Sequence, residues 1–256
     1  MLFGLFGKRK DEEIAAYAKM MTDAAEEGTL EEHLEDLIQL AREKKLSGKE
    51  LGKAQEQALV NVFESFCESG MMSDEDYSDY RALLDACYMV GETKKYEYTT
   101  IAKRCNGLYK IQKKNILPTM KREYVNIHYD QDEKLHFAAS ASLLAWKKGE
   151  TPYVKGAGIS RGTSYKAGAL SLTKPSDGWQ RQDAGVFWMT SKRIGFHSGK
   201  TDVDIPLSAA ESMRIGEGVL QILGREGITT IQITDYDMAG AIFSNLLALT
   251  GTFHAE

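Results

Sequence analysis

The chain has 256 residues, of which 43% are hydrophobic and 27% are charged, and its formal net charge is −5. This balance is typical of a globular protein with one large or two ordinary domains. No run of 18 apolar residues occurs, so we expect no transmembrane helix. The three cysteines, Cys67, Cys87 and Cys105, form no C-x-x-C pair. They favour reduced thiols in a cytoplasmic protein over a disulfide framework or a zinc ribbon.

The charges are distributed unevenly along the chain. Residues 11–92 hold 21 Asp and Glu against 7 Lys and Arg, and residues 93–122 hold one Glu against 9 Lys and Arg. Residues 123–256 are nearly balanced. This distribution predicts three units, which are an acidic helical bundle at 1–92, a basic connecting helix or linker at 93–122, and a third domain at 123–256.

The first unit is predicted to be helical because its apolar residues recur at i, i+3, i+4 and i+7. We expect a first helix over residues 11–27 and a second helix that Thr29 caps. Ser47 and Glu50 have the spacing of a capping box at the start of a third helix, and Ser73 is placed to cap a fourth. Four helices with short connections favour an antiparallel bundle.

The basic segment 93–122 is the strongest candidate for a functional surface outside the third unit, and we expect it to be helical up to Pro118. Its cations could follow a phosphate backbone or an anionic membrane surface, or they could pair with the acidic bundle beside them. The candidate partner surface comprises Lys103, Arg104, Lys110, Lys113 and Lys114.

From residue 123 onward the hydrophobic period changes from about 3.6 to about 2, which is typical of β-strands. Turn residues rich in Gly, Ser and Asp separate the extended segments. We expect antiparallel strands at 135–146, 164–172, 185–190, 193–197, 203–207, 212–215, 219–223 and 229–234, and an amphipathic helix at 236–249.

Residues 185–199, GVFWMTSKRIGFHSG, have the pattern of a hairpin, and the alternating strand TDVDIPL follows at 201–207. This stretch resembles the core of bacterial pleckstrin-homology-like (PH-like, GRAM-type) domains, with their G-hydrophobic-T-x-[KR]-R strand pair and Ile-Pro-Leu strand. The resemblance covers roughly residues 133–250. The fold expected is therefore α+β: an N-terminal α-helical bundle, then a PH-like antiparallel β-barrel or sandwich that a C-terminal helix closes.

In lipid-binding PH domains, basic residues around the first hairpin cradle a phosphorylated head group. The resemblance implies a candidate anion or lipid site in the matching region, at Lys147, Lys148, Lys155, Arg161 and Lys166. Clustered cations on loops can converge on one multiply charged anion. The alternative is a set of solvated surface cations, since Glu150 interrupts the cluster.

Other motifs lack the spacing that their chemistry requires. Residues 195–201, GFHSGKT, have three residues between the glycines where a P-loop has four. Residues 156–162 miss the G-x-G-x-x-G spacing and are expected to form a loop. Asp74, Asp76 and Asp85 imitate a calcium loop that lacks its glycine and its final Glu. We therefore expect no cofactor and no metal.

No combination of nucleophile, base and oxyanion donor can be identified, and a hairpin tip explains why His197, Ser198 and Asp202 are neighbours. The sequence predicts a cytoplasmic, non-enzymatic binding or scaffold protein that acts mainly through protein–protein interaction. Two alternatives stay open. One is peripheral association with anionic lipid at the inner face of the membrane, through the basic loops and residues 1–10. The other is nucleic-acid binding through residues 94–122.

Overall fold

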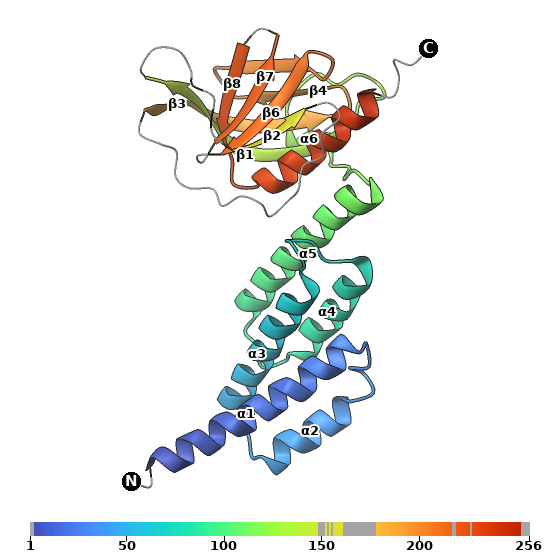
Figure 1. The fold of residues 1–256 in the computed structure, drawn as a ribbon, viewed down its shortest axis with the longest axis vertical. Helices are drawn as coiled ribbons and strands as arrows, with labels where there is room; N and C mark the ends of the chain where they lie inside the picture. Colours follow the sequence, from blue (N-terminus) through green and yellow to red (C-terminus); the bar gives the residue numbers. More distant parts are fainter. Residues whose placement is uncertain are drawn as a thin grey trace. The chain divides into compact units, whose positions relative to one another are not determined.

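A computed structural model describes residues 3–147, 152, 154, 156–160, 178–216, 219–225 and 227–251. The described residues form an α+β fold, with an N-terminal helical part and an eight-stranded antiparallel sheet (Figure 1). The chain divides into a helical unit, Met1–Tyr109, and a sheet unit, Lys110–Glu256. The boundary falls within helix α5 (Glu92–Lys114), so the basic segment 93–122 belongs partly to each unit.

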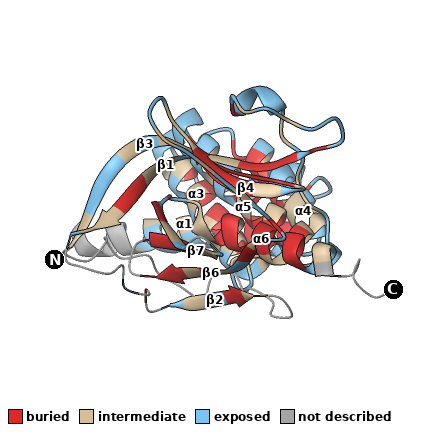
Figure 2. Cartoon of the chain, turned by 90° about the horizontal axis from the view of Figure 1, so that it is seen from above, coloured by how far each residue is buried: buried red, intermediate tan, exposed pale blue. Residues whose placement is uncertain are grey.

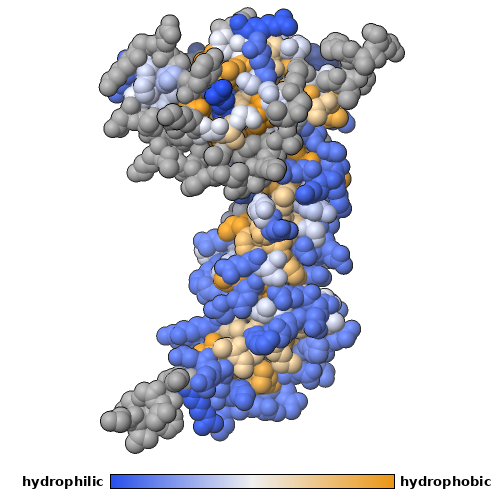
Figure 3. All heavy atoms as spheres, in the orientation of Figure 1, coloured by the Kyte–Doolittle hydropathy of each residue, from blue (hydrophilic) through white to orange (hydrophobic). Residues whose placement is uncertain are grey.

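Helices with apolar inner faces make up the helical unit. They are α1 (Phe3–Glu26), α2 (Leu34–Glu43), α3 (Gly48–Phe66) and α4 (Asp74–Ala86), followed by the first part of α5. Helix α1 packs against α2, α3 and α4, and α3 packs against α4. The core of the unit includes the fully buried Leu59, Val62, Tyr80 and Leu83. Hydrophilic residues cover most of the face of this unit that Figure 3 presents, as its acidic composition requires.

Two of the predicted helix caps are confirmed. The Ser47 hydroxyl accepts the N–H of Glu50, and the Glu50 carboxylate accepts the N–H of Ser47, which completes the capping box of α3. The Ser73 hydroxyl accepts the N–H of Asp76 at the start of α4. These bonds satisfy N–H groups that have no partner inside the helix.

The cap predicted at Thr29 is wrong, because α2 begins only at Leu34. Gly28 adopts a positive φ of 67° and turns the chain at the end of α1. The N–H and the hydroxyl of Thr29 then both donate to the carbonyl of Ala24. Thr29 therefore closes the C-terminus of α1 and is not available to cap α2.

Helix α5 ends at Lys114, ahead of the predicted end at Pro118. Asn115 adopts a positive φ of 54°, and the N–H of Ile116 bonds back to the carbonyl of Lys110 at 3.0 Å. This closure satisfies a carbonyl of the last turn, so the helix stops before proline could interrupt it.

The sheet unit holds a single sheet in the order β2-β6-β7-β8-β1-β3-β4-β5 among its described residues. The strands are β1 (Leu135–Trp146), β2 (Ala157–Ser160), β3 (Trp179–Thr190), β4 (Arg193–His197), β5 (Asp202–Pro206), β6 (Ala210–Gly216), β7 (Val219–Gly224) and β8 (Gly227–Gln232). Strand β1 is central and pairs with β3 on one side and with β8 on the other. The strand predicted at 164–172 lies outside the described residues.

The closed barrel that we expected is wrong, since the described strands form an open sheet whose end strands are β2 and β5. Closure would require the two end strands, β2 and β5, to pair, and no described pair joins them. Strand β2 pairs with the outer edge of β6, from Ala157 opposite Ile215 to Ser160 opposite Ser212. The segment 156–162 was expected to be a loop, so the end strand at Ala157–Ser160 was not predicted.

The open sheet is nevertheless strongly curved. A Cβ atom on Gly224, at the end of β7, would lie 3.5 Å from Cγ2 of Ile205 on β5. Three strands separate β8 from β5 in the sheet order, yet the β7–β8 turn faces β5. Helix α6 (Tyr236–Gly251) packs against β1, β2 and β6, and Figure 2 shows most of it buried. Its inner face includes Ile242, Phe243 and Leu246.

Candidate functional site

The Thr190-Ser-Lys-Arg193 motif forms the tight turn between β3 and β4. The Thr190 hydroxyl oxygen accepts the N–H groups of Lys192 and Arg193, at 3.2 and 3.1 Å. The same hydroxyl donates to Oε1 of Glu133 at 2.6 Å. Threonine is suited to this position because one hydroxyl both closes the turn and binds a carboxylate.

Glu133 is the buried centre of this turn, and its side chain has no exposed surface. Nε of Arg193 donates to Oε1 at 2.9 Å, and the N–H of Asp130 donates to Oε2 at 3.0 Å. Burial alone would raise the pKa of Glu133, but the hydrogen bonds from Arg193 and Thr190 outweigh it and the pKa is lowered. The carboxylate is thus held ionised, with its lone pairs occupied, and acts as an anchor for the chain that precedes β1.

Arg193 connects the buried Glu133 to β5. Its guanidinium also pairs with the carboxylate of Asp204 and donates to the carbonyl of His128. The same group lies 5.4 Å from the ring centroid of Trp188, within the range of a cation–π contact. One side chain therefore fixes the position of β5 relative to β3 and β4.

Strand β5 has an unoccupied outer edge among the described residues. In an antiparallel pair, alternate residues bond to the neighbouring strand. Leu207 donates to the carbonyl of Lys192, and Ser198 donates to that of Thr201, which fixes the register with β4. The backbone groups of Val203 and Ile205 consequently point toward β4. Those of Asp202 and Asp204 point away from it, whereas the carbonyl of Pro206 accepts the N–H of Ala209 at 2.8 Å.

A cleft of about 650 Å³ adjoins this strand, between β5 and the β7–β8 turn. The lining residues are Asp202, Val203, Asp204, Ile205, Pro206, Ala209, Gly224, Arg225, Gly227, Ile228 and Thr229. Val203, Ile205 and Ile228 are half-buried and supply apolar surface, whereas Asp202 and Asp204 are exposed carboxylates. The cleft thus offers backbone hydrogen-bonding groups, apolar contact and acidic charge together.

Residues around the β4–β5 turn are committed to the turn itself. Ser198 Oγ donates to the carboxylate of Asp183 and accepts the N–H groups of Lys200 and Thr201, at 3.0 and 2.8 Å. Asp202 Oδ1 lies 2.6 Å from Nδ1 of His197. The P-loop-like residues 195–201 are this strand and turn, and Ser198 is held by backbone amides.

The basic face of α5 brings together three of the predicted cations. Lys103, Lys110 and Lys114 are separated by seven and four residues, so they lie on one side of the helix, at intervals of roughly 10 and 6 Å along its axis. Lys103 and Lys114 are exposed and Lys110 is half-buried. Arg104 and Lys113 lie on the flanks, roughly 80–100° around the helix.

Other cations of the basic segment are held inside their own unit. Lys94 pairs with the carboxylate of Glu56 on α3. The guanidinium of Arg122 donates to the carbonyls of Asp130 and Gln131, at 3.2 and 3.1 Å, and lies over the ring of Tyr129. The expected pairing with the acidic bundle is therefore confirmed for Lys94. Arg122 instead binds carbonyls of the segment that precedes β1.

The candidate lipid site is described at one position only. Lys147 follows β1 and is exposed. Lys148, Lys155, Arg161 and Lys166 lie outside the described residues, as does the interrupting Glu150.

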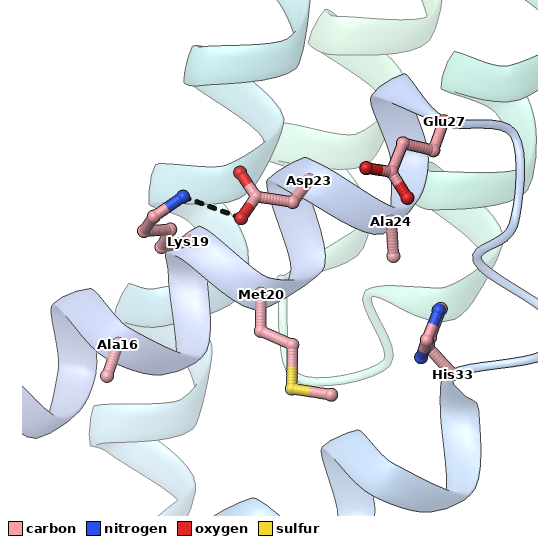
Figure 4. Close-up of a pocket in the computed structure, with 7 residues that line it drawn as sticks. All are labelled: Ala16, Lys19, Met20, Asp23, Ala24, Glu27 and His33. Atoms are coloured by element: carbon pink, nitrogen blue, oxygen red, sulfur yellow. Dashed lines mark hydrogen bonds and ion pairs between the residues drawn. The ribbon is translucent and has the colours of Figure 1, made fainter.

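The helical unit has an open groove of about 370 Å³ between α1 and the start of α2 (Figure 4). Met20 and Ala24 supply an apolar floor, and Lys19 pairs with Asp23 at 2.6 Å on its rim. No polar side chain that lines the groove is buried. A small molecule would find no desolvated polar partner there, which is a poor basis for specific recognition.

The calcium-like acids mark the start of α4. Asp74 Oδ1 accepts a hydrogen bond from Asn106 Nδ2 at 2.8 Å, and Asp76 contributes its N–H to the Ser73 cap. Within the described ranges, no group of three or more His, Cys, Asp or Glu side chains is placed to hold a metal ion. No described helix is both long enough and apolar enough to cross a membrane.

Sequence reasoning missed Glu133 and the edge of β5. A lone Glu in a polar segment gives no signal of burial, and its partners lie 57 and 60 residues away. The edge depends on strand order, which the hydrophobic period does not encode. Comparison of the chain with protein-family models gives no match, and comparison with curated proteins gives none either.

Proposed function

We propose that the chain is a binding protein whose sheet unit takes up an extended segment of another protein along the outer edge of β5. The observation that carries the proposal is the coincidence of that edge, which no described strand pairs with, and the cleft of about 650 Å³ beside it. An added strand gains affinity from backbone hydrogen bonds and specificity from pockets for alternate side chains. Binding of this kind requires no catalytic group.

The chemistry of the cleft defines the segment. Alternate residues of the segment would face Val203 and Ile205 and should be apolar. Asp204 pairs with Arg193 and Asp202 contacts His197, but both carboxylates are exposed and can accept further hydrogen bonds. They favour Lys or Arg at the other positions of the segment. Pro206 offers no N–H and its carbonyl already accepts the N–H of Ala209, so pairing should extend over Asp202 and Asp204 and end before Pro206.

We further propose that the sheet unit is a PH-like domain. Three features support this assignment. Strand β1 is shared between β3 and β8, and helix α6 follows the last strand and packs on the sheet. The Thr190-to-Arg193 turn and the Ile-Pro-Leu strand also stand next to each other, with Arg193 opposite Pro206.

The test is a selection of peptides from a random displayed library on the immobilised full chain, followed by fluorescence titration of the best binder. The decisive comparison is Asp204→Pro with Asp204→Ala. Both variants remove the carboxylate, but only proline removes the outward N–H. We expect Asp204→Pro to bind at least tenfold more weakly than Asp204→Ala, at equal melting temperature. Equal affinity of the two folded variants, or a library that yields no binder, would contradict the proposal.

A second candidate function is nucleic-acid binding through α5, which the alignment of Lys103, Lys110 and Lys114 favours. Three cations on one helix face can contact successive phosphates, although three contacts give only weak, salt-dependent binding. Binding to anionic lipid is the third candidate function. Co-sedimentation with phosphatidylserine vesicles distinguishes it from peptide binding and from nucleic-acid binding.

A further inference from the structure

We infer that Cys67 and Cys105 form a redox-active thiol pair in the helical unit. Their sulfur atoms lie 3.2 Å apart although the residues are 38 positions apart in the sequence. Both are free thiols, with Cys67 half-exposed at the end of α3 and Cys105 buried on α5. A disulfide requires a sulfur separation of about 2.05 Å, so the two atoms need to approach by only about 1.2 Å.

Two hydrogen bonds hold the turn after α3 against the part of α5 that carries Cys105. The N–H of Met72 donates to the carbonyl of Cys105 at 3.3 Å. One residue further along α5, Nδ2 of Asn106 donates to the carbonyl of Met72, also at 3.3 Å. Met72, in the turn after α3, is therefore fastened to α5 beside Cys105. Because this contact holds the turn against the helix that carries Cys105, we expect a disulfide to form without a large backbone movement.

The two thiols differ in the way that an attacking and a resolving cysteine require. The hydrogen bond between the two sulfur atoms lowers the pKa of Cys67, and the N–H of Gly70 and the charge of Arg104 act in the same direction. The hydrogen bond and burial raise the pKa of Cys105. Cys67 is also the more exposed of the two, so an oxidant reaches the sulfur that ionises more readily.

The oxidant class that fits this arrangement is a hydroperoxide, with hydrogen peroxide as the simplest member. The Cys67 thiolate attacks one peroxide oxygen, the O–O bond breaks, and a sulfenic acid and water form after protonation. The Cys105 sulfur then attacks the Cys67 sulfur and displaces a second water. Two thiols and one hydrogen peroxide thus give one disulfide and two waters. A small dithiol then reduces the disulfide, becomes oxidised itself and restores both thiols.

The test treats the reduced full chain with one equivalent of hydrogen peroxide and counts thiols after denaturation. We expect the three thiols to fall to one, the intact mass to fall by about 2 Da, and a peptide map to join Cys67 to Cys105. Cys87→Ser is the matched control, since burial raises the pKa of Cys87 to about 12 and it should play no part. That variant should lose both of its thiols.

Two further variants test the order of attack. Cys105→Ser should accumulate a sulfenic acid on Cys67 that dimedone traps, and Cys67→Ser should give no trapped product. Retention of all three thiols, a disulfide between two chains, or a bond that includes Cys87 would overturn the inference. The peptide map uses the unmodified chain, so it decides the question even if a variant does not fold.

Oxidation should also stabilise the helical unit, because the bond closes a loop of 38 residues that contains α4. We expect its melting temperature to rise by about 10 °C. A lower melting temperature for the oxidised chain would show that the geometry does not suit a disulfide and would count against the inference.

Discussion

Nε of Arg193 lies 2.9 Å from Oε1 of Glu133, a carboxylate with no exposed surface, and this contact joins segments that are 60 residues apart. Arg193 belongs to β4 and also holds Asp204 of β5. The chain before β1 and the edge strand that we propose as a binding site are consequently positioned by the same guanidinium. Loss of Glu133 should therefore affect the stability of the sheet unit and the placement of its edge.

Replacement of Glu133 by Ala should destabilise the sheet unit by about 3 kcal/mol. The variant leaves the Thr190 hydroxyl, the Asp130 N–H and one side of the Arg193 guanidinium without their buried partner, and such losses are costly. Tryptophan fluorescence in urea measures this unit alone, because Trp146, Trp179 and Trp188 are the three tryptophans of the chain.

Asp132→Ala is the matched control for this prediction. Asp132 pairs with Lys192 at 2.6 Å, but its side chain is 78% exposed. An exposed pair contributes little, so this variant should stay within about 0.5 kcal/mol of the parent. Equal effects of the two substitutions would show that Glu133 is not the anchor.

The same carboxylate predicts that the sheet unit loses stability in acid. The pKa of Glu133 is lowered by folding, so the folded state binds its proton less readily than the unfolded state. Its contribution is present above the unfolded pKa of about 4.3 and is lost as the pH falls through the folded value. In Glu133→Gln this contribution is absent at every pH. The free-energy difference between parent and variant, from urea titrations at pH 7, 5, 4 and 3, should shrink below about pH 4.5. A difference that stays constant from pH 7 to pH 3 would contradict this assignment.

The parts of the fold that could be predicted from the sequence are those with local causes. The period of the apolar residues predicted β1 with its observed bounds. The spacing of Ser47 and Glu50 predicted the capping box at the start of α3. Thr29 was misassigned because two helix ends compete for it, and Gly28 decides the outcome through its positive φ. Strand β2 was missed because four residues around Gly158 carry little pattern.

The candidate site depends on contacts over long sequence separations, which a single sequence does not contain. The TSKR motif was recognised as a resemblance, but its partner Glu133 was not, because nothing in residues 128–134 marks that carboxylate as buried. Likewise, the sulfur contact between Cys67 and Cys105 depends on how α5 lies against the end of α3. Counting cysteines could indicate reduced thiols but could not pair them.

Replacement of Gly195 by alanine should strongly destabilise the sheet unit. A Cβ atom at this position in β4 would lie 2.0 Å from the carbonyl oxygen of Val203 and 2.5 Å from the Trp188 ring. Neither a paired strand nor a fully buried indole can yield easily, so Gly195→Ala should cost 3 kcal/mol or more, roughly the scale of severe overpacking.

Gly199 supplies the matched control, since a Cβ atom there meets nothing within 4 Å. Gly199→Ala should change the free energy of unfolding by less than about 0.5 kcal/mol. The measurement is again tryptophan fluorescence in urea. A Gly195→Ala variant as stable as Gly199→Ala would mean that β4 and β5 are not packed as described.

The lysines of α5 predict a weak affinity for duplex DNA that depends strongly on salt. A plot of log K against log salt has a negative slope, and each phosphate contact adds about one to its magnitude. Lys103, Lys110 and Lys114 together should therefore contribute about three to the magnitude of the slope. The variant with alanine at all three positions should bind every DNA sequence more weakly than the parent. The magnitude of its slope should also be smaller than that of the parent. The control replaces the exposed Lys45, Lys49 and Lys53 of the helical unit, which changes the net charge equally. If both triple variants reduce the magnitude of the slope to the same extent, the affinity depends on net charge alone, and α5 is not a nucleic-acid site.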